Sequence, residues 1–140
     1  MTHPWIASYP PGVPATIDPN AYSSVVALLE ESFARYSERK AYACMGKELR
    51  YADVDRLSRA LAAWLQSRGL AQGDRVAVMM PNILQYPVTV AAVLRAGCVL
   101  VNVNPLYTAR ELAHQLKDSG ARAIVMFDRH LATLESIVGE

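Results

Sequence analysis

The second half of the chain alternates short apolar runs with helical patterns, and this alternation restricts the possible folds more than any other feature. Three apolar runs predict strands, and they cover residues 75–79, 98–103 and 123–127. A helical pattern follows each strand, at residues 82–96, 108–119 and 129–138. Such alternation is typical of right-handed βαβ units, which build a parallel sheet covered by helices. The sequence therefore predicts a three-layer α/β fold.

Polar residues and glycines mark the ends of these helices. Asn82, with Gln85 three residues later, predicts the N-cap of the first helix. Thr108 and Glu111 have the spacing of a complete capping box for the second. Gly97 is expected to end the first helix, because glycine readily takes the left-handed conformation found there.

The N-terminal residues 1–22 form a lead-in that contains five of the eight prolines. Proline continues neither a helix nor a central strand, so this segment is expected to be extended and to lie over the surface of the body. Residues 23–140 are then expected to form one folded unit.

A helix and a hairpin are predicted between the lead-in and the parallel strands. The helix starts at Ser23 or Ser24, either of which is a suitable N-cap, and ends near Tyr36. Two strand-like runs within residues 41–51 flank Gly46-Lys47, a pair typical of a two-residue hairpin turn.

A further helix is predicted over residues 52–68. Its spacing places Trp64 on the apolar face and Asp55 on the outer face. Gly69 follows at the position where glycine usually ends a helix.

Composition excludes several classes of protein. With 14 basic and 13 acidic residues, the net charge is +1, and no basic face for nucleic acid is expected. Two cysteines, Cys44 and Cys98, lie in apolar runs and predict buried, reduced thiols of a cytoplasmic protein. The apolar stretch 83–103 is interrupted by Arg95 and Gly97, so it predicts a buried helix and strand in place of a membrane span.

Motifs for phosphate binding and catalysis are missing from the sequence. Neither Gly-x-Gly-x-x-Gly nor Gly-x-x-x-x-Gly-Lys occurs, and Gly46-Lys47 fits a hairpin turn. Glu111 and His114 share one helix face, but a metal site of that type needs a second such pair and further carboxylates. We therefore predict no catalytic, cofactor-binding or metal-binding set within these residues.

The carboxyl ends of the predicted parallel strands are the one place where a ligand is expected. Asn104, Pro105 and Tyr107 follow the second strand and are predicted to line part of a substrate route. The alternative for these three residues is a purely structural loop. For Asn82 and Thr108 the alternative is helix capping.

Several sequence blocks resemble a known family. The block Gly73-Asp-Arg-Val-Ala-Val-Met-Met-Pro-Asn82 is similar to an early motif of adenylate-forming enzymes. Gln85-Tyr-Pro-Val88, Leu94-Arg-Ala-Gly97 and Val101-Asn-Val-Asn-Pro-Leu-Tyr-Thr108 resemble bacterial long-chain fatty acyl-CoA synthetases more specifically. The lead-in is also similar to theirs, so the resemblance covers nearly the whole chain.

The resemblance implies an enzyme several times longer than 140 residues. Such an enzyme uses ATP and Mg²⁺ to convert a fatty acid to an acyl-adenylate and then transfers the acyl group to CoA. Its phosphate loop, adenylate-binding residues and catalytic lysine are expected beyond residue 140. Residues 23–140 would be the first part of its large N-terminal domain, inactive alone and binding none of these cofactors.

The resemblance also implies partners and a location. The remainder of the longer chain is the expected partner, with fatty acid and CoA as ligands of the whole enzyme at the inner face of the membrane. Open sheet edges would favour self-association, including exchange of elements between copies.

Two other interpretations remain open at this stage. One is a stand-alone interaction or oligomerisation module with the same fold; the other, a free nucleotide-binding domain, lacks a phosphate loop. One departure from the family concerns Arg50, which precedes the helix where relatives usually have Ser or Thr as the N-cap.

Overall fold

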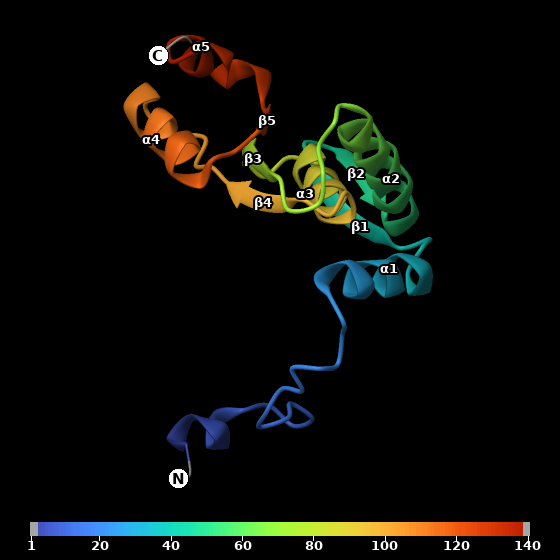
Figure 1. The fold of residues 1–140 in the computed structure, drawn as a ribbon. Coiled ribbons are helices and arrows are strands. Elements are labelled where there is room, and N and C mark those ends of the chain that lie inside the picture. Colours follow the sequence, from blue (N-terminus) through green and yellow to red (C-terminus); the bar gives the residue numbers. More distant parts are fainter. Residues whose placement is uncertain (1–2, 139–140) are drawn as a thin grey trace.

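A computed structural model describes residues 3–138 as an α/β body with an N-terminal arm (Figure 1). Two short 3₁₀ helices, η1 and η2, accompany five α-helices and five strands within this range. The order is η1 (Pro4–Ser8), α1 (Val25–Arg35), β1 (Lys40–Cys44), β2 (Lys47–Arg50), α2 (Tyr51–Ser67), β3 (Arg75–Met79), α3 (Gln85–Arg95), β4 (Val99–Asn102), α4 (Ala109–Ser119), β5 (Ala123–Met126), η2 (Asp128–His130) and α5 (Leu131–Glu135).

The central sheet has three parallel strands in the order β4-β3-β5. Val76 of β3 pairs with Leu100 of β4 on one side and with Ala123 of β5 on the other. Because β3 is covered on both faces and both edges, its residues 76–79 are at most 1% exposed. The predicted parallel sheet of βαβ units is confirmed.

Helices cover both faces of this sheet. Val76 and Val78 point to a core shared with α2 and α3, whereas Ala77 and Met79 point to a core shared with α4 and α5. Successive side chains of a strand point to opposite faces, so one apolar run feeds both cores. The three-layer prediction is confirmed.

The start of α3 differs from the sequence prediction. The helix begins at Gln85, and Asn82 lies in the preceding bend without capping it. A start after Asn82 would have required the N–H of Pro87, which does not exist, to bond within the helix. With the observed start, Pro87 is among the first four residues, whose N–H groups have no partner inside a helix.

The hairpin turn is shifted by one residue from its predicted position. Cys44 pairs with Lys47, so the two turn residues are Met45 and Gly46. Their φ angles are 48° and 73°, which is the left-handed pair of a type I′ turn.

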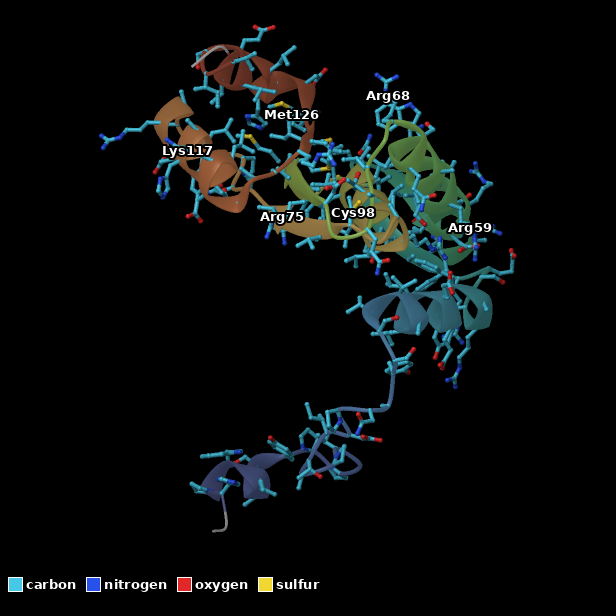
Figure 2. All side chains as sticks on the ribbon, viewed as in Figure 1. Arg59, Arg68, Arg75, Cys98, Lys117 and Met126 are labelled. Carbon is cyan, nitrogen blue, oxygen red and sulfur yellow. The ribbon has the colours of Figure 1, made fainter. Side chains whose placement is uncertain are left out.

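Helix α2 buries a narrower face than the sequence predicts. Val54, Ser58 and Leu65 are each at most 1% exposed, whereas Trp64 is 54% exposed and the prediction that it is a core residue is wrong. Trp64 lines an open depression beside β5, and Arg68 stacks over the ring with its Cζ 5.8 Å from the centroid. Arg68 and Arg59 extend from the outer side of α2 (Figure 2).

An ion-pair cluster joins α1, α2 and α3. The Arg95 side chain is only 6% exposed and donates hydrogen bonds to the Asp55 carboxylate and to Ser58 Oγ. It also lies near Glu30 of α1 and over the Phe33 ring, with its Cζ 5.0 Å from the centroid. The prediction that Asp55 faces solvent is therefore corrected: it faces Arg95.

The lead-in extends away from the body in Figure 1. Pro4–Ser8 form η1, and the described residues from 9 to 22 are all exposed. The expected packing of this segment over the body surface is therefore not observed. None of the helices within residues 3–138 is long and apolar enough to span a bilayer.

Candidate functional site

The carboxyl ends of the three parallel strands lie together at one edge of the sheet. The chain leaves β3 toward α3 on one face and leaves β4 toward α4 on the other face (Figure 1). Loops that diverge in this way open a crevice at the edge, which is where α/β sheets bind ligands. The residues predicted to line a substrate route follow β4 at this edge.

Asn104 fixes the loop that follows β4. Its side-chain Oδ1 accepts a hydrogen bond from the N–H of Leu106 at 3.0 Å, and its carbonyl oxygen accepts one from the N–H of Tyr107 at 3.1 Å. Pro105 and Tyr107 are half-buried, and Leu106 at the tip is 84% exposed. The structure therefore brings Asn104, Pro105 and Tyr107 together in one tight turn.

The loop passes directly into the capping box of α4, as predicted. The N–H and hydroxyl of Thr108 donate to Glu111 Oε2 at 2.8 and 2.7 Å. In return, Thr108 Oγ1 accepts a longer bond from the N–H of Glu111. The two bonds that Thr108 donates, that of the backbone N–H first and that of the hydroxyl second, lower the pKa of the Glu111 carboxyl. Thr108 is therefore engaged in helix capping.

Asn102, at the end of β4, connects both helices that flank the edge. Tyr86 Oη in the first turn of α3 donates to Asn102 Oδ1 at 2.9 Å. Gln115 Nε2 of α4 donates to the carbonyl oxygen of Asn102, also at 2.9 Å. Sequence reasoning missed this junction, although a polar residue at the end of an apolar strand was a usable signal.

An open depression of about 680 Å³ lies beside the loop, along α4. It is lined by charged and polar side chains of both signs, including Arg110, Glu111, His114 and Asp118. No group of three or more metal-ligating side chains occurs in residues 3–138. Glu111 and His114 both lie on an exposed face of α4.

The other end of the parallel strands, where β3 and β4 begin, carries structural contacts. Asp74 Oδ2 accepts hydrogen bonds from the N–H of Ala71 and from Arg122, each at 2.7 Å, and these lower its pKa. Cys98, labelled in Figure 2, is buried, and burial together with the charge of Asp74 raises the pKa of its thiol. A thiol held in its protonated form is a poor nucleophile.

Comparison with known proteins places the chain in a family. The model of the AMP-binding enzyme family matches residues 29–139. The chain belongs to the AMP-binding enzyme family. A long-chain-fatty-acid–CoA ligase from Escherichia coli O6:H1 is 51% identical over 139 residues, which are 99% of this chain and 25% of the ligase. The Bacillus subtilis ligase of the same name is 40% identical over 125 residues, or 89% of this chain and 22% of its own length.

Two solved structures are similar in fold to this chain. A fatty acyl CoA synthetase of Mycobacterium tuberculosis matches 82% of this chain and 23% of its own, with a TM-score of 0.76 and 25% identity. The N-terminal subdomain of Klebsiella oxytoca NpsA, solved with anthranilyl-AMSN, matches 75% of this chain and 28% of its own, with a TM-score of 0.72 and 28% identity. The chain thus spans about a quarter of the length of the relatives it matches.

Proposed function

We propose that this chain is part of an AMP-forming long-chain fatty acid–CoA ligase. Within it, residues 23–140 form the first part of the large N-terminal domain, and residues 1–22 form its lead-in. The observation that carries the proposal is the 51% identity to the Escherichia coli ligase across 139 residues. Identity of this extent includes the edge loop and both flanking helices.

The proposed reaction has two steps. The fatty acid carboxylate attacks the α-phosphorus of ATP, pyrophosphate leaves, and an acyl-adenylate forms. The CoA thiol then attacks the acyl carbonyl carbon and loses its proton, and AMP leaves.

The nucleotide chemistry is assigned to other parts of the longer protein. The turns after β3 and β4, residues 80–84 and 103–108, contain no glycine, lysine or arginine. A triphosphate needs closely approaching backbone N–H groups or cations, and neither turn offers them. We therefore expect ATP and Mg²⁺ to be held by residues outside 1–140.

This chain is proposed to supply a wall of the substrate route. Asn104 holds the loop in shape, and Pro105 and Tyr107 present an uncharged, partly apolar surface at the carboxyl edge. Such a surface suits an acyl chain better than it suits a charged group. Because fatty acids partition into lipid whereas ATP and CoA are dissolved in the cytoplasm, we place the enzyme at the inner face of the membrane.

A test uses the longer protein that contains this chain. Fatty-acid-dependent pyrophosphate release and acyl-CoA formation are expected from it, and their absence would overturn the ligase assignment. The 140-residue chain alone is expected to release no pyrophosphate, and release by it would refute the assignment of the nucleotide site elsewhere.

Variants of the longer protein test the substrate route. Tyr107→Ala and Asn104→Ala are expected to raise KM for the fatty acid or lower kcat by about tenfold, equivalent to roughly 1.4 kcal/mol. Gln66→Ala, on the exposed side of α2, is the matched control and should leave both constants unchanged. Wild-type kinetics in both loop variants would overturn the route while leaving the ligase assignment intact.

A further inference from the structure

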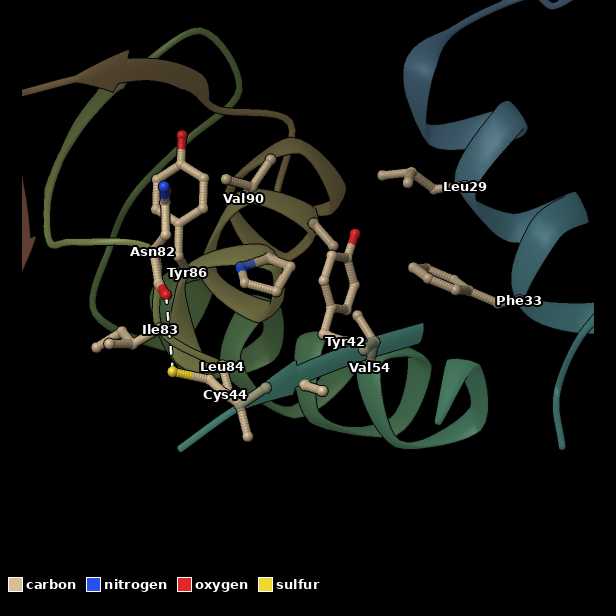
Figure 3. A pocket seen from close by; sticks show the side chains of 13 residues that line it. Leu29, Phe33, Tyr42, Cys44, Val54, Asn82, Ile83, Leu84, Tyr86 and Val90 are labelled. Carbon is tan, nitrogen blue, oxygen red and sulfur yellow. Dashed lines mark hydrogen bonds between the residues drawn. The ribbon is translucent and has the colours of Figure 1, made fainter. Parts of the chain in front are cut away.

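A pocket of about 440 Å³ lies between α1, β1, α2 and the first turns of α3 (Figure 3). None of its lining residues belongs to the edge loop 104–107. Its walls are mainly apolar and aromatic, and they include Leu29, Phe33, Tyr42, Val54, Pro87 and Val90. A volume of this size and lining falls in the range of small-molecule sites.

Polar groups gather at one end of the pocket. Cys44 Sγ donates a hydrogen bond to the carbonyl oxygen of Asn82 at 3.8 Å, and both residues line that end (Figure 3). The side-chain amide of Asn82 has no hydrogen-bond partner among residues 3–138 and is exposed. Leu29 and Phe33 of α1 stand at the other end (Figure 3). Apart from the Tyr42 hydroxyl, which lies on the side of Leu29 (Figure 3), the pocket therefore has an apolar body and one end that can form hydrogen bonds.

Among residues 3–138, none of those lining the pocket is charged. The guanidinium of Arg95 stacks over the Phe33 ring, but it is 6% exposed and is already bound to Asp55, Ser58 and Glu30. A carboxylate in this pocket would lose its hydration without gaining a cation, which is strongly unfavourable. The pocket therefore favours neutral ligands over anions.

We propose that this pocket binds an uncharged amphiphile, with an alkyl or aromatic body and a single hydrogen-bonding head. The body packs against Phe33, Tyr42 and Val90, and the head meets the amide of Asn82 and the thiol of Cys44. This site goes beyond the proposed ligase reaction, because the acid substrate of that reaction is an anion at neutral pH.

The probe pair 1-octanol and octanoate tests the selectivity by isothermal titration calorimetry on the 140-residue chain at pH 8. We expect saturable binding of one octanol per chain and binding of octanoate weaker by about tenfold or more. Octanol should also slow the modification of Cys44 by a thiol reagent, with buried Cys98 as the internal reference. Failure of octanol to saturate, or equal binding of octanoate, would overturn the proposal.

A variant that fills the pocket tests where octanol binds. Val90→Phe enlarges a half-buried side chain of α3 that lines the pocket, and Ala63→Phe adds a ring on the exposed side of α2. We expect about tenfold weaker octanol binding only in Val90→Phe. Unchanged binding in Val90→Phe would refute the site. If that variant fails to fold by circular dichroism, the probe pair and Cys44 protection decide the question. None of these measurements depends on ligase activity.

Discussion

Arg95 carries its charge into the interior, where three helices meet. Its guanidinium contacts α2 through Asp55 and Ser58, α1 through Glu30, and the face of the Phe33 ring. A buried cation is tolerated only when its partners replace the water it has lost. Removing one partner therefore costs more than the pair itself contributes, because the remaining charge stays buried.

Asp55→Asn removes the carboxylate while keeping the shape of the side chain. Because the Asp55 side chain is 30% exposed, we expect a loss of about 2–3 kcal/mol in the free energy of unfolding, below the 3–5 kcal/mol of a fully buried pair. Urea unfolding monitored by circular dichroism measures it. Asp118→Asn, on the exposed side of α4, is the control and should change stability little. Equal effects of both substitutions would contradict this role of Asp55.

The same cluster predicts sensitivity to acid. Partial burial tends to raise the pKa of Asp55, but the hydrogen bonds and charges of Arg95 and Arg59 outweigh it and hold the pKa below the ordinary value of 3.8. A lowered pKa adds stability above the unfolded value, and this stability is lost as pH falls through the folded value. Unfolding series from pH 6 down to about pH 2 should therefore show a smaller acid loss in Asp55→Asn than in the wild type. Parallel pH profiles would contradict the prediction.

Arg50 is the N-cap of α2 but has no acceptor to offer. Its guanidinium pairs with Glu38 on the surface, and its backbone N–H donates to Asp53 Oδ2 at 3.0 Å. No side-chain atom of Arg50 therefore accepts from an N–H of the first turn of α2. Exposed pairs of this kind contribute little, whereas a Thr hydroxyl would bind a free N–H of the helix. We expect Arg50→Thr to raise the free energy of unfolding by about 0.5–1 kcal/mol, measured by urea unfolding. Arg56→Thr, inside the same helix, should be destabilising, and a loss in Arg50→Thr would refute the missing-cap explanation.

At the scale of an element, the hairpin contains an unusual turn residue. Met45 is 93% exposed and has a φ of 48°, a conformation that unbranched side chains adopt only at a cost. Asn is favoured at this first position of a type I′ turn. The strands themselves therefore hold Met45 in place.

Met45→Asn should accordingly stabilise the chain by about 0.5–1 kcal/mol, since Asn tolerates the left-handed conformation. Thermal unfolding followed by circular dichroism checks this. Met45→Val is the comparison, because a branched side chain is least compatible with a positive φ, and it should lower the melting temperature. The opposite order of the two variants would show that the turn is not under this constraint.

The element starts show which local signals were reliable. Thr108 and Glu111 cap α4 as predicted, because both halves of the capping box lie within four residues and need no other part of the fold. Asn82 was a wrong N-cap because Pro87, further along, controls where α3 can begin. Trp64 was placed in the core because helical spacing does not show how wide the buried face of a helix is.

At the scale of the whole molecule, the layer order followed from periodicity, but the contacts between layers did not. The apolar run 75–79 predicted a strand covered on both faces, and this is β3. The pairs Asn102–Tyr86 and Arg95–Asp55 join residues 16 and 40 positions apart, so no local pattern marks them. The pocket was missed for the same reason, because its walls come from four separate elements. For the edge loop, sequence predicted the location of Asn104, Pro105 and Tyr107, and their role in a substrate route stays a prediction.

The two outer strands of the central sheet, β4 and β5, each have one side that pairs with no other strand within residues 3–138. Val99 on β4 is 46% exposed, and all four residues of β5 are half-buried. Open strand edges pair readily with other strands, so we expect the chain of 15.4 kDa to self-associate with rising concentration. Static light scattering should show a mass above that of one chain, and a single-chain mass at high concentration would contradict this.

Val99→Lys tests the β4 edge, because a lysine on an edge strand opposes pairing. We expect it to weaken association about tenfold in the same scattering measurement. Val13→Lys, at a similarly exposed position in the lead-in, is the charge-matched control. Equal association of both variants would place the contact elsewhere.

The extended N-terminal arm also changes how large the particle looks in solution. A compact chain of 140 residues has a radius of gyration of about 14 Å. An arm that extends from the body, as in Figure 1, adds drag without adding mass. A size-exclusion column would therefore elute one chain earlier than a compact protein of 15.4 kDa. Static light scattering measures the mass of the particle, so it distinguishes a single chain with an extended arm from a dimer.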